Sequence, residues 1–175
     1  MRAYLQHRLS AGKLQVPLQR QSAAKTPCAT GVRYESVDKA LETYASAVYN
    51  KNVETFMHLY EPGARVFDTW GVWSYEDAAA WRVAVEGWLS SLGTERVKVT
   101  FEDIRIVADR DFASVSAVVT YKGMSAEGEA LRAMQNRLTW VLRVSGHVLR
   151  IIHEHTSAPV GFEDMKAILQ KAPAR

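Results

Sequence analysis

Four long strand-like segments occupy the second half of this chain, and they constrain its fold more than any other feature. Short turn sequences separate them: "DRD", a glycine-containing "GMSAEGE" and "SG". The segments cover residues 97–108, 112–122, 130–144 and 147–157. Because turns this short join neighbouring strands that run in opposite directions, the sequence predicts a sheet that is mostly antiparallel.

Three helix-like segments come before these strands. Apolar residues recur at spacings of three and four over residues 36–48, over the short segment 53–60 and again over 77–92. A short strand is expected at 65–69, and the motif "EPG" and Gly93 end the second and third helices. Helices followed by a run of long strands predict an α+β fold, with the helices packed on one face of a curved sheet.

The chain has the length of one domain, and its composition divides it into three parts. Residues 35–160 form the expected domain, and residues 161–175 are expected to be a short amphipathic helix and a frayed end. Residues 1–34 contain six lysines or arginines and no acid, which is typical of an organellar transit peptide. A flexible extension or a misassigned start codon would look the same. We therefore expect a cytoplasmic protein, or a mitochondrial one if residues 1–34 are a transit peptide.

Charge and hydropathy argue against two classes of partner. The formal charge of +3 comes from the N-terminal segment, since the remainder holds 19 acidic and 16 basic residues. We therefore expect no nucleic-acid binding by the folded domain. No run approaches the roughly 18 apolar residues that cross a bilayer, so no membrane partner is expected either. The single cysteine, Cys28, cannot form an internal disulfide.

Three stretches of the domain carry a family resemblance: "ALETYASAVYNKNVETFMHLYEPGARVFD", "VTFEDIRI" and "NRLTWVLRVSGHVLRIIHEHTSAP". They resemble the NTF2-like superfamily, and more narrowly its SnoaL-like and ketosteroid-isomerase-like members. The last stretch is also similar to the end of the calcium/calmodulin-dependent kinase II association domain. The resemblance implies a cone whose mouth opens between the helices and the concave face of the sheet. It also implies a pocket for a small hydrophobic molecule, no cofactor, and a homodimer formed through the sheet.

Ketosteroid isomerases resemble this chain most closely at two functional positions. Their oxyanion-hole tyrosine matches Tyr44 and their catalytic base matches Asp68, with the spacing kept without a gap. Their second oxyanion donor, a protonated carboxylic acid, falls on or near Asn136, whose amide donates a hydrogen bond but cannot supply a proton. The residues alone leave other interpretations open, because Asp68 could form an Asx-turn and Tyr44 could be a core residue.

Four tryptophans are candidates for contact with a ligand. Trp70 and Trp73 lie in the loop expected at the mouth of the cone, where flat rings could hold a ring-shaped substrate. Trp88 lies on the apolar stripe of the third helix, where packing in the core would also explain it. Trp140 is expected to face the cavity together with Asn136, because residues two apart on a strand share a face.

Two histidines flank a glutamate in "RIIHEHTSAP". Strand alternation counted from Leu149 predicts that His153 and His155 point into the pocket and that Glu154 points away from it. We expect His155 to be a secondary polar group of the catalytic site and His153 to contact the ligand, although structural hydrogen bonding would explain both. A metal site needs a third ligand, which the sequence does not obviously supply, and the spacing is not HExxH. No metal is therefore expected.

The sequence thus predicts a SnoaL-like domain that binds a small hydrophobic molecule. Its candidate activity is that of a cofactor-free isomerase, cyclase or hydratase, in which Asp68 removes a proton while Tyr44 and Asn136 donate to the developing oxyanion. The alternative is a non-catalytic module for ligand binding or oligomerisation, like a kinase association domain.

Overall fold

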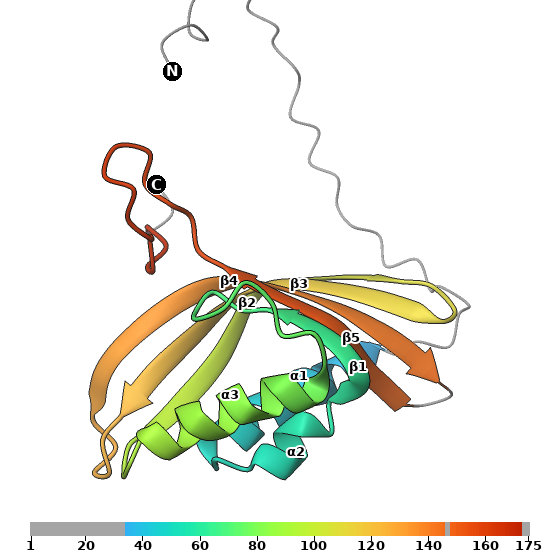
Figure 1. Ribbon diagram of the computed structural model, residues 1–175, viewed down its shortest axis with the longest axis horizontal. Helices are drawn as coiled ribbons and strands as arrows, with labels where there is room; N and C mark the ends of the chain where they lie inside the picture. Colours follow the sequence, from blue (N-terminus) through green and yellow to red (C-terminus); the bar gives the residue numbers. More distant parts are fainter. Residues whose placement is uncertain (1–33, 146–147, 173–175) are drawn as a thin grey trace, which may run out of the picture.

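Three helices lie together against one face of a single sheet in the computed structural model, which describes residues 34–145 and 148–172 (Figure 1). The helices are α1 (Tyr34–Tyr49), α2 (Val53–Met57) and α3 (Ala78–Ser91). Within these described ranges, no helix is long and apolar enough to cross a membrane. The expectations for the N-terminal extension lie outside the described residues.

The sheet has five strands in the order β1-β5-β4-β3-β2. Their bounds are β1 (Tyr60–Phe67), β2 (Arg96–Ala108), β3 (Phe112–Met124), β4 (Ala130–Ser145) and β5 (Val148–Ser157). Every neighbouring pair is antiparallel except β1 and β5, which are parallel. The sheet arches over the helices without closing, and its concave face is turned toward them (Figure 1). The predicted α+β fold, with helices on a curved and mostly antiparallel sheet, is confirmed.

Local sequence explains where the helices begin and what they bury. The Asp77 side chain accepts a hydrogen bond from the Ala80 backbone N–H (2.8 Å) and so caps the first turn of α3. Trp81, Val85 and Leu89 follow at spacings of four and are all buried against the sheet. The stripe of α1 is buried in the same way, so the core fills the space between the helices and the concave face.

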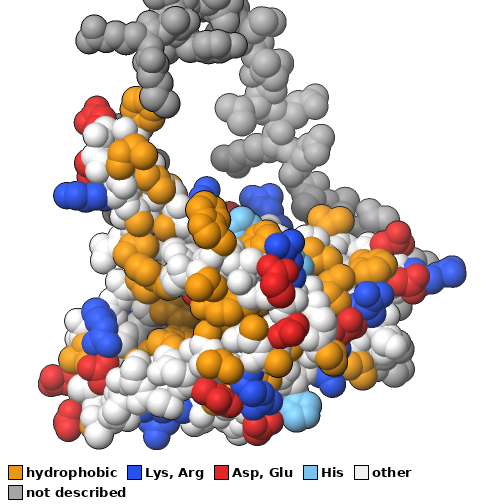
Figure 2. Space-filling model, viewed as in Figure 1, with side chains coloured by type: hydrophobic (Ala, Val, Ile, Leu, Met, Phe, Trp, Pro, Cys, Tyr) orange, Lys and Arg blue, Asp and Glu red, His pale blue; other side chains and the backbone are white. Residues whose placement is uncertain are grey.

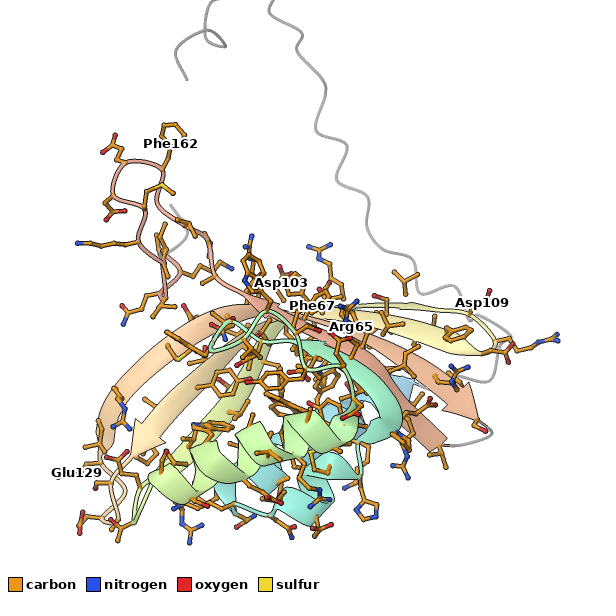
Figure 3. All side chains as sticks on the ribbon, in the orientation of Figure 1. Arg65, Phe67, Asp103, Asp109, Glu129 and Phe162 are labelled. Atoms are coloured by element: carbon orange, nitrogen blue, oxygen red, sulfur yellow. The ribbon has the colours of Figure 1, made fainter. Side chains whose placement is uncertain are left out.

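Two segments differ from their predicted structure. The second helix ends at Met57 and β1 already begins at Tyr60, where a helix to residue 60 and a strand from residue 65 were expected. In place of the short helix expected after residue 160, the chain forms turns and a bridge between Val160 and Ala167. Met165 has a φ of 56°, in the left-handed region, which interrupts a right-handed helix. This segment extends away from the body, with Phe162 exposed (Figure 3).

A one-residue irregularity in β5 changes which side chains face the core. Val141 of β4 pairs with His153, whereas the next residue, Leu142, pairs with Ile151. Ile152 is therefore an extra residue in β5, as in a β-bulge. Such an insertion moves every later side chain to the opposite face from the one that strict alternation predicts.

The prediction for the faces of β5 is consequently wrong beyond the irregularity. Ile151 is buried as expected, but the next buried side chains are Glu154 and Thr156. His153 and His155 lie on the outer face of the sheet. Because both residues of the pair Ile151 and Ile152 are apolar, the alternation pattern gave no sign of the inserted residue.

Candidate functional site

A cavity of about 440 Å³ lies between the helices and the concave face of the sheet. Figure 2 shows hydrophobic side chains lining a hollow on this face, between α3 and the sheet. The wall is mostly apolar and rich in aromatic rings. Its lining residues are Tyr44, Asp68, Trp70, Gly71, Tyr75, Trp81, Ala84, Val85, Trp88, Leu92, Val97, Tyr121, Gly123, Arg132, Ala133, Met134, Asn136 and Glu154. Size and lining suit a small, flat organic molecule held by a few polar groups.

Asp68 lies in the wall of this cavity, directly after β1. Its Oδ1 accepts a hydrogen bond from the Thr156 hydroxyl (2.8 Å), and its Oδ2 accepts one from the Trp70 backbone N–H (3.3 Å). The second bond is the Asx-type contact considered from the sequence, so Asp68 both shapes the loop and faces the cavity. Burial raises the pKa of this carboxyl, while the hydrogen bonds from Thr156 and from the backbone oppose the rise.

Glu154 is the second carboxyl in the cavity wall, and it is only 1% exposed. Its Oε2 accepts hydrogen bonds from the Tyr60 hydroxyl (2.6 Å) and from Nε1 of Trp140 (2.8 Å). Burial raises the pKa of Glu154 to about 7, the two hydrogen bonds lower it, and the charge of Asp68 raises it further. At neutral pH this group therefore exchanges between an acid and a carboxylate.

Tyr44 and Tyr121 bring two phenols to the same cavity. Their hydroxyl oxygens lie 2.8 Å apart and share one hydrogen bond. Tyr44 is almost fully buried, and its ring packs against those of Phe56 and Trp140. Burial raises the pKa of both phenols far above the neutral range, so each keeps its proton and can act only as a neutral donor or acceptor.

Two buried polar atoms of the cavity wall have no hydrogen-bond partner among the described residues. They are Oδ1 of Asn136 and Nε1 of Trp81. Asn136 is only 4% exposed, and its side-chain amide makes no hydrogen bond within that part of the chain. Buried polar groups are normally paired, so Oδ1 of Asn136 is available to a bound molecule. The Trp81 N–H is close enough to the Tyr60 hydroxyl to lower the pKa of that phenol, so Tyr60 competes with a ligand for it.

The four candidate tryptophans occupy different places. Trp70 and Trp88 line the cavity as expected. Trp73, in the same loop as Trp70, is 98% exposed and lies outside the lining. Trp140 is fully buried and supports the site from behind, through its hydrogen bond to Glu154.

The two histidines do not reach the cavity. Nδ1 of His153 lies 2.9 Å from the Arg65 carbonyl oxygen, and both imidazole rings pack edge-on against Phe67. Arg65 and Phe67 alternate with the buried Val66 and so belong to the outer side of β1 (Figure 3). The structure thus supports the structural interpretation of His153 and leaves His155 exposed. Within the described ranges, no group of three or more His, Cys, Asp or Glu side chains could hold a metal ion.

Glu154 was missed because the strand alternation placed it on the outer face. One signal pointed to it. Trp140 was expected to face inward, and an indole N–H in a core needs an acceptor. Glu154 pairs directly with Trp140 across β4 and β5 and is the acceptor.

The model of the SnoaL-like domain family matches residues 37–161, which include every cavity residue described above. The chain belongs to the SnoaL-like domain family. Among curated proteins, no significant sequence match is found. Assignment to this family agrees with the resemblance stated from the sequence and does not specify a reaction.

Solved structures share the fold at low sequence identity. An NTF2-like protein of unknown function from Pseudomonas putida is 20% identical, with a TM-score of 0.68 over 79% of this chain and 95% of that one. The protein Aln2 from a Streptomyces species is 19% identical, with a TM-score of 0.62 over 71% and 88%. A candidate calcium/calmodulin-dependent protein kinase II association domain from Xanthomonas campestris is 20% identical, with a TM-score of 0.58 over 73% and 89%. These likenesses show an NTF2-like fold.

Proposed function

We propose that the SnoaL-like domain binds a small, largely apolar carbonyl compound and that Asp68 removes a proton from the carbon beside the carbonyl group. The observation that carries this proposal is the place of Asp68, a carboxyl with a raised pKa in the wall of an aromatic cavity. A raised pKa makes the carboxylate a stronger base, and the rings of Trp70 and Trp88 can hold a flat substrate beside it.

The tyrosine pair supports the other half of such a reaction. Two hydroxyl protons are present, but the contact between Tyr44 and Tyr121 uses only one of them. No other side chain in the described ranges accepts a hydrogen bond from either phenol. Whichever phenol donates, the second O–H is free to donate to an oxygen on which negative charge develops, as an oxyanion hole does.

The reaction class follows from these parts. Asp68 takes a proton from one carbon, the electron pair of that C–H bond becomes a C=C bond, and the carbonyl π pair moves to oxygen. In a β,γ-unsaturated ketone, return of the proton to the γ-carbon, while the C=C bond moves into conjugation and the carbonyl re-forms, completes an isomerisation. In a substrate with a second carbonyl group, attack of the enolate carbon on it would form a ring, and the proton held by Asp68 would pass to the new alkoxide. Neither path consumes a cofactor.

Hydrogen–deuterium exchange tests the base without knowledge of the natural substrate. The full chain is incubated in D₂O near neutral pH with a panel of bicyclic ketones, and the loss of α-proton signals is followed by NMR. We expect the wild-type rate to exceed that of Asp68→Asn by about 100-fold or more, the usual contribution of a general base. Asp103→Asn is the matched control, because Asp103 is exposed on the outer side of the sheet (Figure 3). Equal rates for wild type and Asp68→Asn would remove Asp68 from the mechanism.

The alternative is a binding module that uses the same cavity without catalysis. The unpaired atoms of Asn136 and Trp81 would serve binding equally well. This alternative predicts that ketones bind, while the wild type accelerates no exchange over the solvent rate. Dimerisation through the outer face of the sheet stays a prediction, which sedimentation of the purified chain would check.

A further inference from the structure

We propose that Glu154 carries its proton on Oε1 and donates it to the oxygen of a bound, uncharged ring ketone. The proposal names a ligand class for the cavity and a second functional group beside Asp68. The reaction it describes rests on the proposed function above, whereas the hydrogen bond to the ligand requires only that ketones bind.

Two hydrogen bonds to Oε2 favour Oε1 as the oxygen of Glu154 that holds the proton. Oε2 accepts two hydrogen bonds, one from Tyr60 and one from Trp140. An indole nitrogen can only donate, so the bond from Trp140 requires a lone pair on Oε2. When the Tyr60 hydroxyl also donates to Oε2, both lone pairs of Oε2 are in use and a protonated Glu154 holds its hydrogen on Oε1. In the competing arrangement Oε2 holds the proton and donates it to the Tyr60 oxygen, which leaves Oε1 without a proton and predicts ketone binding that does not depend on this acid.

Oε1 is the atom left for a ligand. No hydrogen bond from the described residues reaches it, and Glu154 is part of the cavity wall. Asn136 and Trp81 add two unpaired buried polar atoms to the same cavity. Polar atoms without a partner among the described residues, set in the wall of one mostly apolar cavity, are the arrangement expected of a binding site for a molecule with a few polar atoms.

The charges that face Glu154 favour its neutral form. Tyr44 approaches from α1, Tyr60 from β1 and Tyr121 from β3, and none of these is a cation. The carboxyl of Asp68 repels a second negative charge in the same cavity. A buried carboxylate without a cationic partner is costly, so Glu154 holds a proton up to about pH 7.

Arg132 is the cation in the cavity wall, and α3 contributes no titratable side chain to the lining. Its Nη2 lies 2.5 Å from Oε2 of Glu95, so the guanidinium is already paired outside the cavity. An uncharged ligand that accepts a hydrogen bond therefore fits the interior better than an anion, which the carboxylate of Asp68 would repel.

Combined with Asp68, the acid completes a balanced proton transfer. Asp68 takes the α-proton of the ketone, and Glu154 gives its Oε1 proton to the carbonyl oxygen as the C=O π pair moves there. An enol results, Asp68 is protonated, and Glu154 is ionised. From a β,γ-unsaturated ketone the enol is a dienol. Asp68 then gives its proton to the γ-carbon while Glu154 takes back the O–H proton as the carbonyl re-forms, and both groups are restored.

Binding of 1-tetralone tests the acid separately from the base. This ketone accepts a hydrogen bond but has no O–H or N–H to donate, and tetralin is the same ring system without the carbonyl. Affinities are measured by quenching of tryptophan fluorescence between about pH 6 and pH 8.5. With a pKa of about 7, the protonated fraction of Glu154 falls about 30-fold between pH 6 and pH 8.5. If only the protonated form binds the ketone, the wild-type affinity should fall by up to the same factor. Tetralin should show no such fall.

Glu154→Gln is the decisive variant, because a glutamine keeps an oxygen for Tyr60 and Trp140, presents N–H donors in place of Oε1, and cannot ionise. We expect it to bind 1-tetralone equally well at all these pH values. Glu129→Gln, a change at the exposed turn between β3 and β4, should keep the wild-type pH dependence (Figure 3). In Asp68→Asn the affinity for 1-tetralone should still fall as the pH rises. The midpoint of the fall should lie at a lower pH than in the wild type, because the charge of Asp68 no longer raises the pKa of Glu154.

Three outcomes would overturn the proposal. They are a wild-type affinity that does not change with pH, a fall of the same size in Glu154→Gln, and no binding of 1-tetralone at any pH. If the binding results are as expected but Asp68→Asn exchanges deuterium as fast as the wild type, the proposed base is wrong and the assignment of Glu154 stands.

Discussion

Replacing Glu154 by glutamine should change how the stability of the protein depends on pH. In the folded protein the pKa of this carboxyl is raised from 4.5, its ordinary value, to about 7 by burial. The folded state therefore keeps a proton that the unfolded state releases between these two values. The contribution of Glu154 to the stability of the folded state is therefore fully present below pH 4.5, falls as the pH rises, and is lost above about pH 7.

The size of this loss follows from the two pKa values. One unit of pKa corresponds to about 1.4 kcal/mol, so the free energy of unfolding should fall by about 3 kcal/mol across the window. For a chain of this size, 1 kcal/mol shifts the melting temperature by roughly 2 to 4 °C. Relative to wild type, Glu154→Gln should therefore gain roughly 6 to 12 °C between pH 4.5 and pH 8.

Thermal unfolding followed by circular dichroism at a series of pH values provides the measurement. The quantity of interest is the difference in melting temperature between variant and wild type, because other groups that titrate, including Asp68, are present in both proteins. Glu129→Gln, at an exposed site, should show a difference that stays near zero. If the curves for wild type and Glu154→Gln run parallel, Glu154 does not hold an extra proton in the folded state, and the reasoning fails.

Four other substitutions test separate parts of the structure. Thr156→Val removes the hydroxyl that donates to Asp68, so the pKa of Asp68 should rise. In a plot of the deuterium exchange rate against pH, the loss of rate on the acid side should then begin at a higher pH. Trp73→Ala should change the free energy of unfolding by less than about 0.5 kcal/mol and leave ketone affinity unchanged, whereas Trp88→Ala should weaken binding, because only Trp88 lines the cavity. Asp77→Ala removes the cap of α3 and should cost about 1 kcal/mol in chemical denaturation.

The sequence predicted the fold well because its signals were local. The turns "DRD" and "SG" separate the long strands, and Asp77 precedes an apolar stripe that forms α3. The start of β1 was not predicted, since "LYEPG" reads as the end of a helix and its pairing with β5 is a contact between distant segments. Long-range pairing of this kind has no local signature.

Prediction of the site was uneven for the same reason. Asp68 and Tyr44 both lie in the cavity wall, because the family resemblance fixes their positions directly after β1 and on α1. The direction of Glu154 depended on counting residues along β5, and one extra residue at Ile152 reversed it. The sequence alone does not reveal this extra residue, because either Ile151 or Ile152 could occupy the apolar side of the strand.

The burial of Glu154 is itself an argument for function. The side chains around it in the core are apolar or aromatic, and a valine at this position would satisfy strand propensity and packing. A carboxyl there instead destabilises the folded state near and above neutral pH and requires Tyr60 and Trp140 to act as its donors. Two hydrogen bonds to one oxygen fix the orientation of the group, and the other oxygen accepts no hydrogen bond from the described residues. A group that lowers stability but is held this firmly, beside a second carboxyl, is expected where a proton is transferred to a ligand.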